Sequence, residues 1–145
     1  MERREDNPIV SLVSRTVSPF IMLFALYVIF HGHYSPGGGF QGGTMLAAAF
    51  ILIRLSLGME TSQLQFKSSW ATPLGSAGVL IYFGTGLVAL LFGGNFLDYG
   101  FIPFYATVAE NRSIGILCIE IGVAIAVMAI MVSIYDDLLR GSPDD

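Results

Sequence analysis

A carboxylate lies within an otherwise apolar stretch near the end of the chain. Glu120 stands inside Ser113–Ile134, a run whose other residues are apolar or small. Such a run is long enough to cross a bilayer, which takes about 20 apolar residues. A charged side chain near the bilayer centre costs at least about 2.5 kcal/mol. We therefore expect a partner group, water, a cation or a proton to offset this cost at Glu120.

Two roles are open for this carboxylate. In a structural role, Glu120 would be protonated or hydrogen-bonded to a neighbouring helix. In a transport role, it would exchange protons for cations, because burial favours the neutral form of a carboxyl and a nearby cation favours the charged form. Only one such residue lies deep in this chain, whereas an ion path needs several. The remaining groups of a path would therefore come from partner subunits.

His31 and His33, at the end of the first apolar segment, are the next candidates. The C-terminus of a helix favours a protonated imidazole, and histidine titrates near neutral pH. The two residues are therefore candidates for proton handling at the entrance of an ion path. The alternative is a pair of loop histidines bonded to nearby carbonyl groups. No metal site is predicted, because two histidines at this spacing lack other evident ligands.

A glycine-rich turn follows, and residues 31–43 read HGHYSPGGGFQGG. Its glycines formally match the dinucleotide fingerprint G-x-G-x-x-G, but that fingerprint requires a preceding strand and a βαβ unit. Proline instead ends a regular helix, and consecutive glycines allow positive φ and close approach of another chain. The residues that we assign to this structural motif are Pro36, Gly37, Gly38, Gly39, Phe40, Gln41, Gly42 and Gly43.

Irregular backbone of this kind persists at membrane depth only where protein or a water-filled cavity covers it. We expect Phe40 and Gln41 to start the second helix, and Gly42 and Gly43 to allow tight helix packing. A simple exposed hairpin loop is the alternative interpretation of the turn.

The elements that must position these residues are membrane helices. The 145 residues are 54% hydrophobic and only 12% charged, whereas a soluble domain carries about 25% charged residues. A single all-α integral membrane domain over residues 1–145 is predicted, with one cysteine and hence no internal disulfide. Its four transmembrane helices are expected at about 9–33, 40–58, 73–93 and 113–136.

The distribution of basic residues predicts the orientation, because cytoplasmic loops carry an excess of Lys and Arg. Of the basic residues, only Arg112 falls on the side opposite the termini. Both termini are therefore predicted to be cytoplasmic. The basic residues on the side of the termini are Arg3, Arg4, Arg15, Arg54, Lys67 and Arg140. The net charge of −4 gives no reason to expect nucleic-acid binding.

Acidic residues outside the membrane are given lesser roles. Asp98 and Glu110 are expected to be solvated or paired with Arg112. Asp136 and Asp137 lie at the end of the last helix, where the helix dipole disfavours negative charge. We expect these two to face water or a basic partner.

The last helix has two faces to cover. Each residue of a helix is rotated by about 100° from the one before it. In the last helix this rotation places small residues on one face and Glu120 on nearly the opposite face. The small face favours close approach of another helix, and we expect another subunit to cover one of the two faces. The small residues are Gly115, Cys118, Gly122, Ala126, Ala129 and Ser133.

The stretch HGHYSPGGGFQGG closely resembles the signature of the B subunit of multisubunit Mrp-type Na+/H+ antiporters, the MnhB family. Chain length, number of apolar segments and the late acidic residue also fit. The resemblance implies an accessory subunit of a hetero-oligomeric cation (Na+)/proton antiporter in a prokaryotic plasma membrane. It implies the large A subunit and small membrane subunits as partners, and Na+ and H+ as transported ions. The sequence contains no catalytic triad, metal cluster or cofactor motif, so we expect no enzymatic activity of its own and no cofactor.

Other functions are open at this point. The chain could be a purely structural scaffold, in which Glu120 only pairs with a neighbour. A related stretch occurs in the ion-translocating modules of membrane-bound hydrogenases, so a subunit of such a complex is a further possibility. A self-contained small transporter would need activity from this chain alone, which we do not expect.

Overall fold

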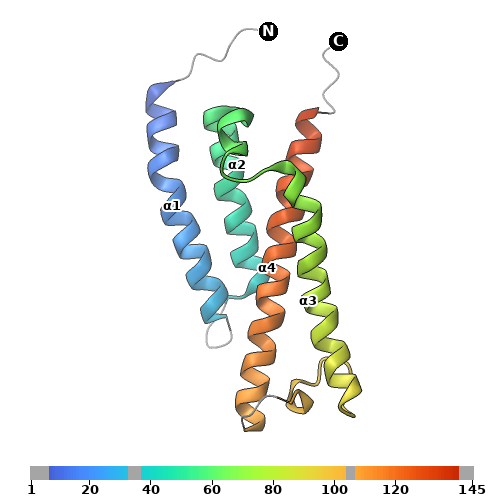
Figure 1. Cartoon of the computed structure of the whole chain (residues 1–145). Coiled ribbons are helices and arrows are strands. Elements are labelled where there is room, and N and C mark those ends of the chain that lie inside the picture. The colour runs from blue at the N-terminus through green and yellow to red at the C-terminus, as the bar shows by residue number, and fades with distance from the viewer. Residues whose placement is uncertain (1–6, 33–36, 104–106, 141–145) are drawn as a thin grey trace.

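The computed structural model describes residues 7–32, 37–103 and 107–140. Within them, four long helices form a bundle (Figure 1) and no strand is present. The helices are α1 (Pro8–His31), α2 (Gly39–Gln63), α3 (Ala71–Leu91) and α4 (Val108–Arg140), with short 3-10 turns η1 (Ser68–Trp70) and η2 (Tyr99–Phe101). Each of the four is long and apolar enough to cross a membrane. The prediction of an all-α membrane protein with four spanning helices is confirmed.

Capping residues set where the helices begin. Asn7 caps α1 by accepting a hydrogen bond from the Ile9 N–H at 3.1 Å, and Pro8 takes the first helical position. At α4, the Glu110 carboxylate accepts from the Thr107 N–H at 2.8 Å, and the Thr107 hydroxyl accepts from the Glu110 N–H at 3.4 Å. This reciprocal capping box gives exposed Glu110 a role that the sequence analysis missed.

Two helices differ in length from the predicted ranges. Because of its cap, α4 begins at Val108, before the predicted residue 113, and it continues to Arg140. The helix α2 extends past the predicted residue 58 to Gln63. Gly58 interrupts it with φ 81° and ψ 164°, and the part able to span the membrane ends there.

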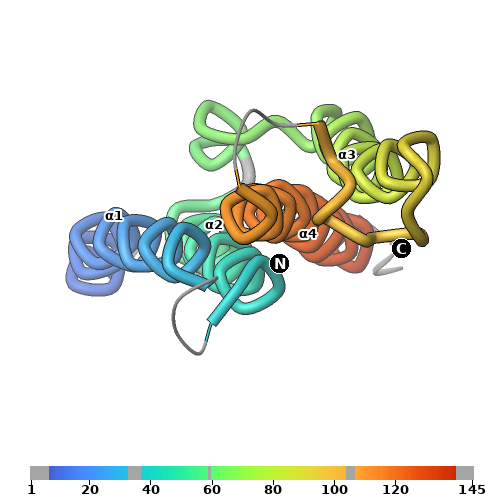
Figure 2. Tube along the Cα trace, turned by 90° about the horizontal axis from the view of Figure 1, so that it is seen from below, coloured from blue at the N-terminus to red at the C-terminus, as the bar shows by residue number. Residues whose placement is uncertain are grey.

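The helix α4 lies in the middle of the bundle. It packs against α2 on one side and α3 on the other, while α1 packs on α2 (Figure 2). The start of α1 and the end of α4 lie at the same end of the bundle (Figure 1). That this end of the bundle faces the cytoplasm stays a prediction from the distribution of basic residues.

Small residues bring α3 and α4 into direct backbone contact. A Cβ added to Gly78 would lie 2.5 Å from the Gly122 carbonyl oxygen, and 2.9 Å from the Ala126 Cβ. Near the start of α4, Gly115 faces the ring of Tyr99 in η2. The predicted stripe of small residues does pack closely against another segment, and that segment belongs to this chain.

The end of α1 and the start of α2 lie beside the middle of α4 (Figure 1). Glu120 is twelve residues into α4, about 18 Å from its first residue at 1.5 Å per residue. The first turns of α4 extend past the end of α1 and the start of α2 (Figure 1), so these two helix ends lie partway along the spanning helix α4.

Candidate functional site

The Glu120 carboxylate lies against the glycine-rich turn. A Cβ added to Gly32 would lie 2.6 Å from each of the two carboxylate oxygens, and one added to Gly38 would lie 3.2 Å from Oε1. Glu120 is half-buried overall, and its Oε2 atom is buried. The two features that the sequence analysis selected separately, the intramembrane carboxylate and the glycine motif, therefore form one site.

Glycine is needed at this turn for two physical reasons. Gly38, the N-cap of α2, has φ 139°, a conformation that other residues rarely adopt. The second reason is space. A Cβ at Gly39 would collide with the carbonyl group of Glu120, and one at Gly43 would lie 2.6 Å from the Ala124 carbonyl oxygen. The first turn of α2 thus packs directly on the α4 backbone around Glu120.

Two helix ends meet at this carboxylate. Gly32 is the C-cap of α1 and Gly38 the N-cap of α2. The first N–H groups of a helix lack intrahelical acceptors and carry about half a positive charge, which favours an anion. The last carbonyl groups of a helix carry the opposite partial charge and favour a cation. The site therefore places a carboxylate where one helix ends and the next begins.

Segments of this chain cover part of Glu120. The helix α3 packs on the small-residue face of α4, and α2 with the glycine turn packs on the Glu120 face. Glu120 is still half-exposed, so the expected cover by another subunit stays a prediction. The shielding of this carboxylate begins within the chain.

His31 lies directly before Gly32, at the last residue of α1. Its ring stacks on that of Tyr27, with centroids 4.2 Å apart, and its Nδ1 donates to the Tyr27 carbonyl oxygen at 3.1 Å. The residue is exposed. His33 and Pro36 lie outside the described residues.

The other motif residues have distinct contacts. Gly42 packs on α1, where an added Cβ would lie 2.9 Å from the Ala25 carbonyl oxygen, and Gly37 faces Val28. Phe40 is 65% exposed and Gln41 is also exposed. The glycines thus serve contacts within the chain, whereas Phe40 and Gln41 lie on its surface.

Comparison with known proteins decides the family. Residues 9–133 match the family described as a domain related to the MnhB subunit of Na+/H+ antiporter. The chain belongs to the MnhB family. The resemblance stated from the glycine motif is therefore correct and extends over nearly the whole chain. The family is described by a subunit of a Na+/H+ antiporter, which is a component of a transporter.

Relatives of this MnhB chain occur in bacteria and archaea. It is 28% identical over 138 residues to the Na+/H+ antiporter B subunit of Bacillus subtilis, covering 94% of this chain and 96% of the relative. It is 31% identical over 133 residues to the Na+/H+ antiporter B subunit of Alkalihalophilus pseudofirmus, covering 86% of this chain and 92% of the relative. An uncharacterized protein of Methanocaldococcus jannaschii is 31% identical over 130 residues, covering 86% of this chain but 49% of the relative.

The family and the four spanning helices together identify a multi-pass protein of the prokaryotic cell membrane. Over the part of the chain that the structure describes, no group of three or more His, Cys, Asp or Glu side chains could hold a metal ion.

A second charged site, missed by the sequence analysis, lies at the other end of α2 and α4. The Arg54 guanidinium and the Asp136 carboxylate form an ion pair of 3.2 Å, with 0% and 2% of their side chains exposed. Arg54 also donates to the Phe66 carbonyl oxygen at 3.0 Å, and the Ser68 hydroxyl donates to Asp136 at 2.5 Å. The pair thus joins two helices and the segment between α2 and α3.

This pairing resolves the expectation for Asp136. The residue does have a basic partner, but the partner is Arg54 of the same chain and the pair is shielded from water. The sequence contained a usable signal, since charged residues inside membrane segments usually pair with one another. Arg54 and Asp136 fall on the same predicted side of the membrane.

Proposed function

We propose that this chain is a membrane subunit of a hetero-oligomeric cation (Na+)/proton antiporter, that it helps to assemble the complex, and that Glu120 lies on the ion path. The large A subunit and the small membrane subunits of that complex would be its partners. The family match and the names of the bacterial relatives support the antiporter. The role of Glu120 rests on the geometry of the glycine turn.

One observation carries the proposed role of Glu120. Its carboxylate lies where the C-terminal end of α1 and the N-terminal end of α2 meet, with Gly32 and Gly38 against its oxygens. In transporters, interrupted helices at mid-membrane bind ions in this manner, with carbonyl groups and helix C-termini coordinating Na+ and helix N-termini facing anions. The turn supplies both kinds of helix end to one carboxylate.

Ion exchange follows from the chemistry of that carboxylate. A cation is held by the carboxylate together with carbonyl oxygens near Gly32, and a proton takes its place when the cation leaves. Either occupant offsets the negative charge of the carboxylate inside the membrane. His31, exposed and next to Gly32, relays protons to this site, and His33 is a candidate for the same step.

The rest of the path must be supplied by the partners. The first turns of α4 extend beyond the hairpin of α1 and α2 (Figure 1), so groups of another subunit are needed between Glu120 and that surface of the membrane. We infer that Phe40 and Gln41, exposed beside the turn, contact such a subunit. The two roles of the chain, assembly and ion conduction, therefore meet at the same turn.

A conservative substitution in the complete complex tests the proposal. In Glu120→Gln the side chain keeps its size but cannot exchange a proton for a cation. We expect cation-driven proton exchange in inverted membrane vesicles to be lost, while the complex remains assembled on a native gel. Glu110→Gln is the matched control, because it makes the same chemical change at an exposed capping residue. Unchanged exchange in Glu120→Gln would instead establish the purely structural scaffold.

A further inference from the structure

A cleft opens between α1 and α2 at the end of the bundle where α1 begins. The two helices are in close contact at Gly42 and diverge toward this end (Figure 1). The cleft encloses about 630 Å³, a volume typical of small-molecule sites. Its lining residues are Arg15, Pro19, Met22, Phe50, Ile53, Leu57, Thr61 and Gln65.

The polarity of this α1–α2 cleft changes along its length. Arg15, Thr61 and Gln65 lie near the start of α1 and the end of α2, whereas Met22 and Phe50 lie deeper. In the described ranges, the side chains of Arg15, Thr61 and Gln65 form no hydrogen bond or ion pair. The polar end therefore offers a guanidinium, a hydroxyl and an amide to a ligand, and the deep end offers only apolar contact.

The depth of Arg15 suits a headgroup contact. It lies seven residues after Pro8, about 10 Å along α1. An arginine at this depth extends its charged group toward the headgroup region while its methylene groups stay in apolar surroundings. Its charge would then lie at the level of lipid phosphates.

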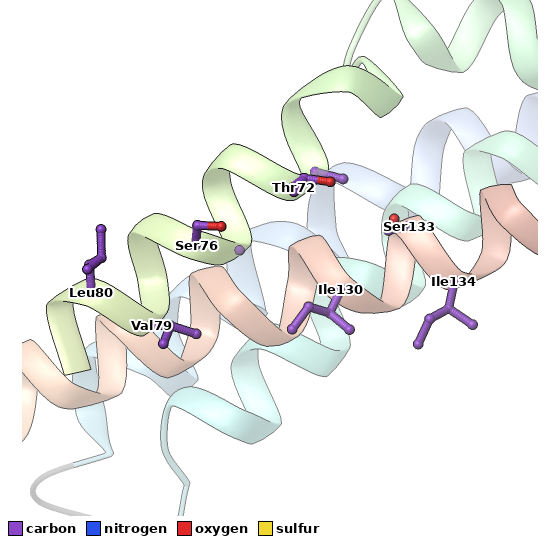
Figure 3. A pocket seen from close by; sticks show the side chains of 9 residues that line it. Thr72, Ser76, Val79, Leu80, Ile130, Ser133 and Ile134 are labelled. Atoms are coloured by element: carbon purple, nitrogen blue, oxygen red, sulfur yellow. The ribbon is translucent and has the colours of Figure 1, made fainter. Parts of the chain in front are cut away.

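A second hollow provides an internal comparison. The groove between α3 and α4 encloses about 570 Å³, and its side chains are apolar apart from hydroxyl groups such as those of Thr72, Ser76 and Ser133 (Figure 3). No charged residue lines it. The groove has the size but not the charge of the α1–α2 cleft, so it has no means of distinguishing an anionic lipid from a neutral one.

We propose that the α1–α2 cleft binds one anionic phospholipid of the inner leaflet. Arg15 pairs with its phosphate, the Thr61 hydroxyl and the Gln65 amide donate to phosphate oxygens, and one acyl chain lies along Met22, Phe50 and their apolar neighbours. Basic pockets between membrane helices on the cytoplasmic side suit anionic headgroups. The deep, apolar end of the cleft adjoins the charged end at Arg15. A ligand that fills both ends needs a phosphate and a hydrocarbon chain, so the cleft fits a lipid better than free phosphate.

Photo-cross-linking in the assembled complex tests this site. The complex is placed in bilayer nanodiscs that contain photoactivatable phosphatidylglycerol or, in parallel, photoactivatable phosphatidylcholine, and labelled peptides are mapped. We expect phosphatidylglycerol to label peptides that contain the cleft residues. Arg15→Gln should lower this labelling about fivefold, the contribution expected from one basic residue near an anionic headgroup. Met22→Trp should abolish labelling by filling the slot.

Matched controls isolate the charge and the cavity. Arg112→Gln removes the same charge from an exposed residue at the other end of the bundle, and Ser76→Trp fills the groove between α3 and α4. Both variants should label like the unaltered complex. Equal labelling by the two lipids, an Arg15→Gln signal equal to that of Arg112→Gln, or cleft peptides left unlabelled because a partner subunit fills the cleft would each overturn the proposal.

Discussion

The backbone of Gly32 and the carboxylate of Glu120 are so close that position 32 has no room for a side chain. A Cβ there would lie 2.6 Å from both carboxylate oxygens and 2.7 Å from the Cα of Gly38. The contact joins the end of α1 to the middle of α4, residues that lie far apart in the sequence. It turns an isolated intramembrane acid into a site bounded by two helix ends.

Gly32→Ala should impair ion exchange without removing the carboxylate. The added methyl group must displace both the Glu120 side chain and the turn at Gly38. Misplacement of a functional group by about 1 Å can reduce a rate about 100-fold, so we expect a loss of at least about tenfold in exchange rate in vesicles. Gly84→Ala is the control, since an added Cβ at Gly84 meets nothing within 4 Å. An unchanged rate in Gly32→Ala would separate the turn from the ion path.

Gly39→Ala should act mainly on stability. Its Cβ would collide with the backbone carbonyl of Glu120, which cannot move aside as a flexible side chain can. Overpacking of this kind costs about 1–3 kcal/mol, so the complex should unfold at a lower temperature in detergent. The measurement is the midpoint of thermal aggregation, followed by size-exclusion chromatography. A midpoint equal to that of Gly84→Ala would show that α2 and α4 are not packed as closely as described.

Breaking the Arg54–Asp136 pair should destabilise the chain far more than replacing it. Arg54→Met leaves the buried Asp136 carboxylate without its ion-pair partner, a change that costs about 3–5 kcal/mol in other proteins. Replacing both partners with apolar residues is often neutral or stabilising. We therefore expect Arg54→Met with Asp136→Leu to recover most of the lost stability in a thermal or denaturant series. Additive losses in the double variant would argue against a direct pair.

The four helices were predictable because long apolar runs separated by proline and glycine indicate membrane helices without any knowledge of the tertiary packing. The two parts of the site were also recognisable, Glu120 by its cost in a membrane and residues 37–43 by their glycines. Their contact was not, because no periodic pattern links Gly32 or Gly38 to a residue on α4. A glycine approaches through its backbone and leaves no complementary side chain to read.

The cover that the chain itself gives Glu120 was missed for the same reason. The backbone of the turn packs on the face of α4 that carries Glu120, whereas contact with another subunit at this face stays a prediction. The pairing of Arg54 with Asp136 was easier to predict, since both residues were expected on the same side of the membrane. Their approach depends on how α2 packs against α4, which the sequence of either helix alone does not specify.

The protonation of Glu120 itself tests the central claim most directly. Infrared difference spectra of the reconstituted complex, recorded without and with Na+, report the C=O stretch of a protonated carboxyl group. If Glu120 exchanges a proton for a cation, addition of Na+ should remove a C=O band that is absent from the Glu120→Gln complex. A spectrum in which Na+ changes no band assignable to Glu120, in a complex that still exchanges ions, would contradict the account.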